Sequence, residues 1–409
     1  MKKILFLLVF IIFCFSVFAQ QISEKAVVLN VEVPVRVFQR NTFIDDLTIN
    51  DFEVFENGKK QRIEAVYLVK KRSIERSEEK KRFAPDTVRN FYLFFELSEY
   101  SAKFGEAVYN FMNNVIDPGD LLTIVTPMKT YRLRGKALEV KSREEITEQL
   151  KGLMRRDILI GNSEYRNSIR ELSAIARLMS ATMNRDENLR FNVDLFASEN
   201  SEENESFREQ LVRYQEILSR LENLRKVDQG KLLDFAEYLK DREGQKYVFL
   251  FYQREYIPQI DPSILNQFLS FYQDSPDIQM NLSNLFDFYR RDPLIDIERV
   301  KKVYADASIS IHFLFFTPVV QKSLGIVFQE RSEDIYSTFS QMARSTGGFI
   351  DSSANPDSLF KKAIDSSRNY YLLYYSPNNY MSDGKFKNIN VRVKNKDYRI
   401  IHRVGYFAN

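Results

Sequence analysis

The sequence is poor in the side chains that do most covalent and acid–base chemistry. It has no tryptophan, two histidines and one cysteine in 409 residues. The cysteine, Cys14, lies in an apolar N-terminal stretch, so the rest of the chain offers neither a thiol nucleophile nor a disulfide framework. His312 and His402 lie in strand-like runs and are expected to pack in sheets. No Gly-x-Ser-x-Gly elbow and no glycine-rich phosphate loop occurs, so we predict that the protein is not an enzyme.

Net charge is also scarce, because the formal value is only +3. A nearly neutral chain has no electrostatic attraction for nucleic acid or an anionic membrane surface. The N-terminus has Lys2 and Lys3, an apolar run over residues 4–17 and the cleavage-like triplet Val17–Ala19. This pattern predicts a signal peptide over residues 1–19. We therefore expect an exported protein, periplasmic or secreted, with no later segment that spans a membrane.

The pattern of strands and helices in the sequence is organised around the stretch Asn90–Ser101. Phe91–Phe95 is a short aromatic run that is typical of a strand buried on both faces. Residues 102–116 have helical spacing, a turn follows at Asp117–Asp120, and Leu121–Val125 is a second buried strand. Strand, helix and strand in this order predict an α/β fold with a doubly wound, mostly parallel sheet.

The flanking regions divide the chain. Alternating residues in 20–70 and 369–409 predict two β segments that pack together as one small β module, and Asn57-Gly58 predicts a hairpin turn. Charge without an apolar period predicts a linker over 71–87. Residues 88–368 would form the α/β domain. A helical insertion over about 142–240 is expected to contain long helices over 142–183 and 206–239, joined by a loop over 184–205.

Eight phrases, in their order and spacing, resemble the von Willebrand factor A-related family of secreted bacterial proteins. They are Val33–Val37, Asp46–Gly58, Phe91–Ser98, Asp117–Asp120, Gly244–Lys246, Ala343–Gly348, Tyr370–Pro377 and Arg403–Tyr406. The resemblance implies a von Willebrand factor A-like domain, with a metal-ion-dependent adhesion site at the carboxyl ends of its strands. In the family, an Asp-x-Ser-x-Ser loop and a later Asp supply ligands to a divalent cation.

This chain departs from that ligand pattern. Glu96 stands at the position of the first Asp, Ser98 matches the first Ser, Tyr100 replaces the second Ser, Ser101 comes one position late, and Gln253 stands at the position of the later Asp. One carboxylate among neutral oxygens suits Mg²⁺ poorly. We therefore expect a degenerate adhesion site with no metal and no cofactor, although weak Mg²⁺ or Ca²⁺ binding at this position is left open.

Two functions are compatible with these observations. The first is a non-enzymatic protein-binding module that recognises a partner through Glu96, Ser98, Tyr100, Ser101 and Gln253. The second is a structural or self-assembling envelope protein that uses its helical insertion. The sequence does not identify the partner.

Overall fold

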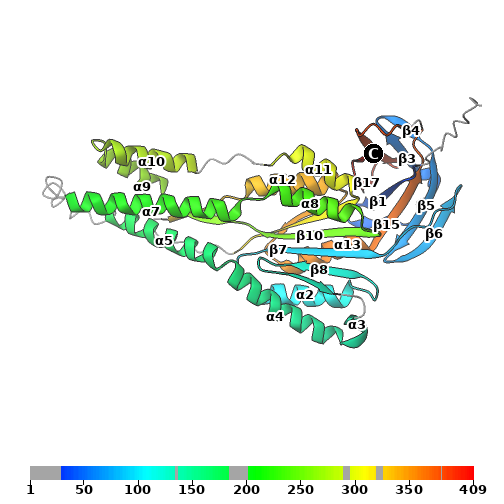
Figure 1. Cartoon of the computed structure of the whole chain (residues 1–409), viewed down its shortest axis with the longest axis horizontal. Helices are drawn as coiled ribbons and strands as arrows, with labels where there is room; N and C mark the ends of the chain where they lie inside the picture. The colour runs from blue at the N-terminus through cyan, green and yellow to red at the C-terminus, as the bar shows by residue number, and fades with distance from the viewer. Residues whose placement is uncertain (1–28, 134–136, 184–200, 289–294, 319–325, 379) are drawn as a thin grey trace, which may run out of the picture.

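The computed structural model describes residues 29–133, 137–183, 201–288, 295–318, 326–378 and 380–409. It has three parts along its length: a β module made by both chain ends, a central sheet covered by helices, and a helical arm that projects away from the module (Figure 1). We call them the terminal module, the central sheet and the arm.

The terminal module consists of two antiparallel sheets. The first has the order β17-β1-β15-β5-β6, with β2 paired to β1, and the second has the order β18-β16-β3-β4. Their bounds are β1 (Val31–Gln39), β2 (Thr42–Phe43), β3 (Phe52–Glu56), β4 (Lys59–Gln61), β5 (Ile63–Lys70), β6 (Ser73–Glu79), β15 (Asn369–Tyr375), β16 (Phe386–Val393), β17 (Arg399–His402) and β18 (Gly405–Phe407). Strand β1 lies antiparallel to β15, with Val33 opposite Leu373, so the two chain ends share one sheet.

Alternation along these strands explains how the two sheets pack. Val31, Val33, Val35 and Val37 of β1 point into one core together with side chains from β3, β5, β15, β16 and β18. The turn between β3 and β4 has positive φ at both central residues, 47° at Asn57 and 81° at Gly58. The predicted Asn-Gly hairpin is therefore confirmed.

The central sheet has the order β14-β12-β10-β7-β8-β9. Its strands are β7 (Arg89–Glu96), β8 (Leu121–Val125), β9 (Thr130–Leu133), β10 (Gln245–Gln253), β12 (Ile309–Phe316) and β14 (Ile350–Ser353). The pairs from β14 to β8 are parallel, whereas β9 is antiparallel to β8. A 3-10 turn (η2, Ile49–Asp51) precedes β3, and a short helix, α3 (Ala137–Val140), follows β9.

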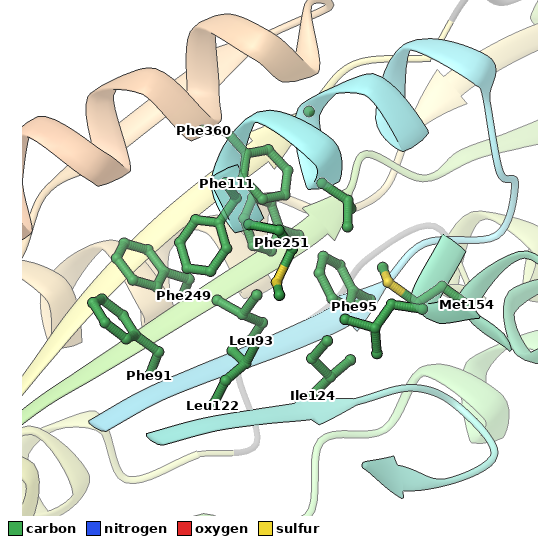
Figure 2. Packing of buried hydrophobic residues seen from close by; sticks show 14 of the residues in the cluster. Phe91, Leu93, Phe95, Phe111, Leu122, Ile124, Met154, Phe249, Phe251 and Phe360 are labelled. Carbon is green, nitrogen blue, oxygen red and sulfur yellow. The ribbon is translucent and has the colours of Figure 1, made fainter. Parts of the chain in front are cut away.

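Helices cover both faces of the central sheet. One face packs against α2 (Ala102–Asn114), α4 (Arg143–Gly161) and α13 (Pro356–Arg368), and the other against α8 (Gln229–Lys240), α11 (Ile297–Asp306) and α12 (Glu333–Ser345). Figure 2 shows the first interface, where Phe249 and Phe251 of β10 meet Phe111 of α2 and Phe360 of α13. The rings of Phe251 and Phe360 stack with centroids 4.3 Å apart. Neighbouring strand residues point to opposite faces, both of which are covered, and this explains the unbroken apolar runs Phe91–Phe95 in β7 and Tyr247–Tyr252 in β10.

The arm has a hydrophobic core of its own. It is built from α5 (Ser163–Met183), α7 (Ser201–Arg225), α9 (Pro262–Phe271), α10 (Pro276–Phe288) and the two-stranded antiparallel sheet β11 (Tyr256–Ile260) with β13 (Ile326–Glu330). Leu172, Met179, Leu211 and Leu221 belong to this core, which is a separate cluster from those of the central sheet.

The structure corrects the expected fold class. A doubly wound, mostly parallel sheet of the von Willebrand factor A-like kind is wrong for this chain, because three of the four described sheets are wholly antiparallel and the fourth is mixed. The expected linker over 71–87 is also corrected, because β6 within it pairs with β5. The expected helix over 142–183 is broken at Asn162 between α4 and α5. Most of the expected 184–205 loop lies outside the described residues.

Candidate functional site

The five residues predicted as a site lie at or just after the carboxyl ends of β7 and β10. These strands are adjacent and parallel, and the register pairs Tyr252 with Glu96. Gln253 ends β10, and the loop that contains Ser98, Tyr100 and Ser101 leaves β7 beside it.

Ser98 and Gln253 are in direct contact. The backbone N–H of Ser98 donates to Oε1 of Gln253 over 3.1 Å. On the other side of the loop, Arg166 donates from Nη1 to the Ser98 carbonyl over 2.9 Å, and Asn162 donates from Nδ2 to the Leu97 carbonyl over 2.9 Å. The base of the arm, where α4 meets α5, therefore holds this loop in place.

Tyr100 and Ser101 belong to a different environment. The Tyr100 ring packs edge-on against Phe104 of α2, with centroids 5.7 Å apart, and burial raises the pKa of its hydroxyl. Ser101 caps α2, because its Oγ accepts from the N–H of Phe104 over 3.2 Å. These two side chains therefore stabilise the start of α2 and are not directed at Gln253.

Glu96 is the last residue of β7 and lies at the boundary between solvent and the protein interior. Its side chain is exposed to solvent, yet the protein mass around it raises the pKa of the carboxyl through desolvation. Glu96 also contributes to the raised pKa of the neighbouring Tyr252 hydroxyl, behind the larger effect of burial, which takes that pKa to about 12. Because its carboxyl is accessible to solvent, Glu96 is able to accept hydrogen bonds from a partner.

Sequence reasoning missed a buried ion network next to these residues. Arg225, the last residue of α7, has a side chain only 2% exposed and pairs with Glu255 and, at 3.8 Å, with Asp334 of α12. Tyr252 donates from its hydroxyl to Oε1 of Glu255 over 2.8 Å, and Arg225 donates to the carbonyl of Arg331. The network joins the end of β10 to α7 and α12.

A second arginine fixes the neighbouring strand ends. Arg254 donates from Nη1 to Oε2 of Glu330 over 2.7 Å and from Nη2 to the hydroxyl of Ser352 over 3.1 Å. Its guanidinium also lies 4.5 Å from the centroid of the Phe315 ring. These contacts link β10, β12, β13 and β14. No sequence signal could have found either network, because the side-chain partners of Arg225 and Arg254 are 30 to 109 residues away from them in the sequence.

The charged side chains at this edge of the central sheet mainly join strands and helices to one another. Among residues whose placement the structure describes, no group of three or more His, Cys, Asp or Glu side chains is placed to hold a metal ion. The nearby carboxylates of Glu255 and Glu330 are engaged by arginines. His312 is fully buried in β12, where its ring stacks on Phe249 at 4.7 Å, and burial holds its pKa well below the usual range.

Comparisons with known proteins do not place the chain in a family. No family model and no curated protein matches it. Among solved structures, the human COPII-coat protein Sec24c aligns with a TM-score of 0.32 and 8% identity, over 80% of this chain and 44% of that one. A TM-score this low does not indicate a shared fold. This chain also spans less than half of Sec24c.

The expected membership of the von Willebrand factor A-related family is therefore wrong. No family model supports it, and the sheets in the described part of the chain are mostly antiparallel, which does not match that fold. Without the family, the ligand positions implied for Glu96, Ser98, Tyr100, Ser101 and Gln253 have no basis in a known site. Of the helices that the structure describes, none is long and apolar enough to cross a membrane.

Proposed function

We propose that this protein is an exported, non-enzymatic protein-binding module whose arm provides the main contact surface. The observation that carries the proposal is the arm itself. It has its own hydrophobic core and extends away from the central sheet (Figure 1). Because the arm has a separate core, its outer side chains are available for contact with another protein.

The outer surface of the arm supports a contact role. Phe271 at the end of α9 is 51% exposed and Met280 on α10 is 61% exposed, although both helices bury other apolar side chains. Aromatic residues and methionine are enriched at the cores of protein interfaces. Tyr272, next to Phe271, instead stacks on Phe207 with centroids 4.7 Å apart, so the α9–α10 hairpin is braced from inside.

The base of the arm supports the same proposal. Arg166, Asn162 and Arg225 tie it to the carboxyl ends of β7 and β10. We propose no cofactor for this surface. Export is proposed from the leader pattern over residues 1–19, which lie outside the described part of the chain.

The test compares two variants of the full chain as bait for envelope proteins after cross-linking. The double variant Phe271→Glu, Met280→Glu places charge on the hairpin surface, and we expect it to lose the captured partner. The control Val140→Glu changes an 82% exposed apolar residue beside the central sheet, and it should capture as the unchanged protein does. Equal capture by all three proteins would refute a role for the arm.

Self-assembly is the second candidate, favoured by the same exposed apolar residues on a projecting element. Sedimentation at rising protein concentration distinguishes the two functions. Self-assembly predicts a mass that increases with concentration and returns to that of one chain in the Phe271→Glu, Met280→Glu variant. A constant mass would leave binding of a different protein as the proposal.

A further inference from the structure

The contact between the terminal module and the central sheet contains an unusual set of buried donors. Glu32 and Arg36 of β1 face away from the core that contains Val31, Val33, Val35 and Val37, and they contact the beginning of β10. Gln245 of β10 donates from Nε2 to Oε1 of Glu32 over 2.9 Å, which fixes one point of this contact. Arg36 of β1 donates from Nη1 to the Gly347 carbonyl over 2.9 Å, which fixes another.

Arg36 is the centre of the set. It is only 2% exposed. Among described residues no carboxylate pairs with it, and its Nε–H has no acceptor. Its guanidinium lies 5.8 Å from the centroid of the Tyr247 ring. A buried guanidinium with one carbonyl partner is costly unless a negative charge lies near it.

Two buried hydroxyls accompany Arg36. The register that sets Val35 opposite Tyr371 places Arg36 opposite Tyr370 on the same face of the sheet. Tyr370 and Tyr247 are at most 1% exposed, and among described residues neither hydroxyl has an acceptor; the group that reaches the Tyr247 hydroxyl is the Arg36 guanidinium, itself a donor. Burial raises the pKa of the Tyr370 hydroxyl; Tyr247 and Glu32 raise it further and Arg36 lowers it, so these groups act on one another electrostatically. Three donors without acceptors therefore lie close together.

The surrounding charges leave this spot short of negative charge. Arg89 is matched, because its guanidinium bonds Asp120 at 2.5 Å and Asp117 at 2.9 Å. The Glu32 carboxylate already accepts from Gln245 and from the hydroxyl of Tyr374. Two further cations, Arg403 and Lys246, face the contact and bond backbone carbonyls, and the carboxylate of Asp306 acts on both of them.

We propose that this contact binds one small monovalent anion, of the size and charge of chloride. The Nε–H of Arg36 and the hydroxyls of Tyr247 and Tyr370 would donate to it. An anion here would offset the Arg36 charge and satisfy three donors at once, whereas a water molecule would satisfy donors without supplying charge. Because its ligands come from β1, β15 and β10, the anion would join the terminal module to the central sheet.

The first test is thermal unfolding of the full chain at constant ionic strength, with sodium gluconate replaced stepwise by sodium chloride or bromide. We expect the Tm to rise by about 2 °C and to saturate, as binding to the folded state requires. Arg36→Met should abolish the rise. Tyr370→Phe and Tyr247→Phe, which keep the rings, should each weaken it. Arg399→Met, at an exposed position on the neighbouring strand β17, is the matched control and should respond as the unchanged protein does.

The second test is anomalous diffraction from crystals grown in bromide. A peak among Arg36, Tyr247 and Tyr370 supports the proposal. Ordered water at these atoms in bromide overturns it. Equal Tm values in gluconate and chloride, or the same halide response in all variants, also overturn it. If Arg36→Met does not fold, the two Tyr→Phe variants and the diffraction result decide the question.

Discussion

The arginines that attach the arm to the central sheet have different partners from those that attach the terminal module. At the carboxyl end, beside the arm, Arg225 and Arg254 are matched with Glu255 and Glu330. At the other end Arg89 is also matched, by Asp120 and Asp117, but Arg36 and Arg403, which contact both the terminal module and the elements around the sheet, bond mainly to backbone carbonyls. The comparison shows that the arm is held by charge pairs, in which a mutation can leave one charge unpaired, whereas Arg36 and Arg403 hold the module through backbone carbonyls.

The largest effect is expected from breaking the arm's charge pairs. Arg225→Met removes a cation that is 2% exposed and leaves Glu255, 12% exposed, without its partner. Loss of one member of a buried pair should lower the free energy of unfolding by about 3 kcal/mol, measured by urea denaturation. The control Arg220→Met, whose side chain is 46% exposed and 3.8 Å from Glu171, should cost less than about 0.5 kcal/mol. Similar losses in both variants would contradict the importance of burial.

The module end should instead show a pH dependence. Burial, with Arg403 as the next contributor, lowers the pKa of Lys246 to about 8 from its usual 10.5. Between these values the unfolded chain binds more protons than the folded chain, so Lys246 makes stability increase as pH rises through this range. Because buried tyrosines act in the opposite direction above about pH 10, the useful window is about 8 to 9.5.

Over that window we expect a gain of about 2 kcal/mol in the free energy of unfolding. Lys246→Met should remove this gain, while Lys240→Met, whose side chain is 42% exposed, should retain it. A flat pH profile for the unchanged protein would mean that Lys246 keeps its charge in the folded state.

Some parts of this structure could be predicted from the sequence, and others could not. Local patterns were sufficient for single elements. The run 121–125 became β8 with the same bounds, and Asn57-Gly58 formed its turn because both residues tolerate positive φ. The proximity of Gln253 to the loop after β7 followed from the expectation that two parallel strands end at one edge.

Contacts between segments far apart in the sequence could not be predicted from local patterns. The fold class was wrong because antiparallel pairing predominates in the described sheets: strands from the two chain ends pair antiparallel, and so does β9 at the edge of the central sheet. Strand β6 was missed because its residues are largely exposed and charged, which is suitable for an edge strand but gives no apolar period. The partners of Arg225 depend on the packing of three distant elements, which composition and spacing do not encode.

A smaller effect is expected from the loop that the arm holds. Gln253→Leu keeps the side-chain volume at a position that is 8% exposed but removes the acceptor of the Ser98 N–H. A part-buried donor left without an acceptor should cost about 1 to 2 kcal/mol. Amide exchange followed by mass spectrometry should show faster exchange in residues 97–101 than in the unchanged protein. Unchanged exchange there would show that Arg166 and Asn162 alone hold the loop.

The smallest effect should come from Ser101, which separates a capping role from a binding role. Ser101 Oγ accepts from the N–H of Phe104, and Ser142 Oγ makes the same type of cap on α4 with the N–H of Glu145 at 3.1 Å. Ser101→Ala and Ser142→Ala should therefore each lower the free energy of unfolding by about 1 kcal/mol, measured by urea denaturation. Ser101→Asp should restore most of the loss, because its carboxylate can accept the same bond at a helix N-terminus. If Ser101 acts only as a cap, Ser101→Ala should leave capture of the partner unchanged. A loss of capture with normal stability would instead place Ser101 in the contact surface.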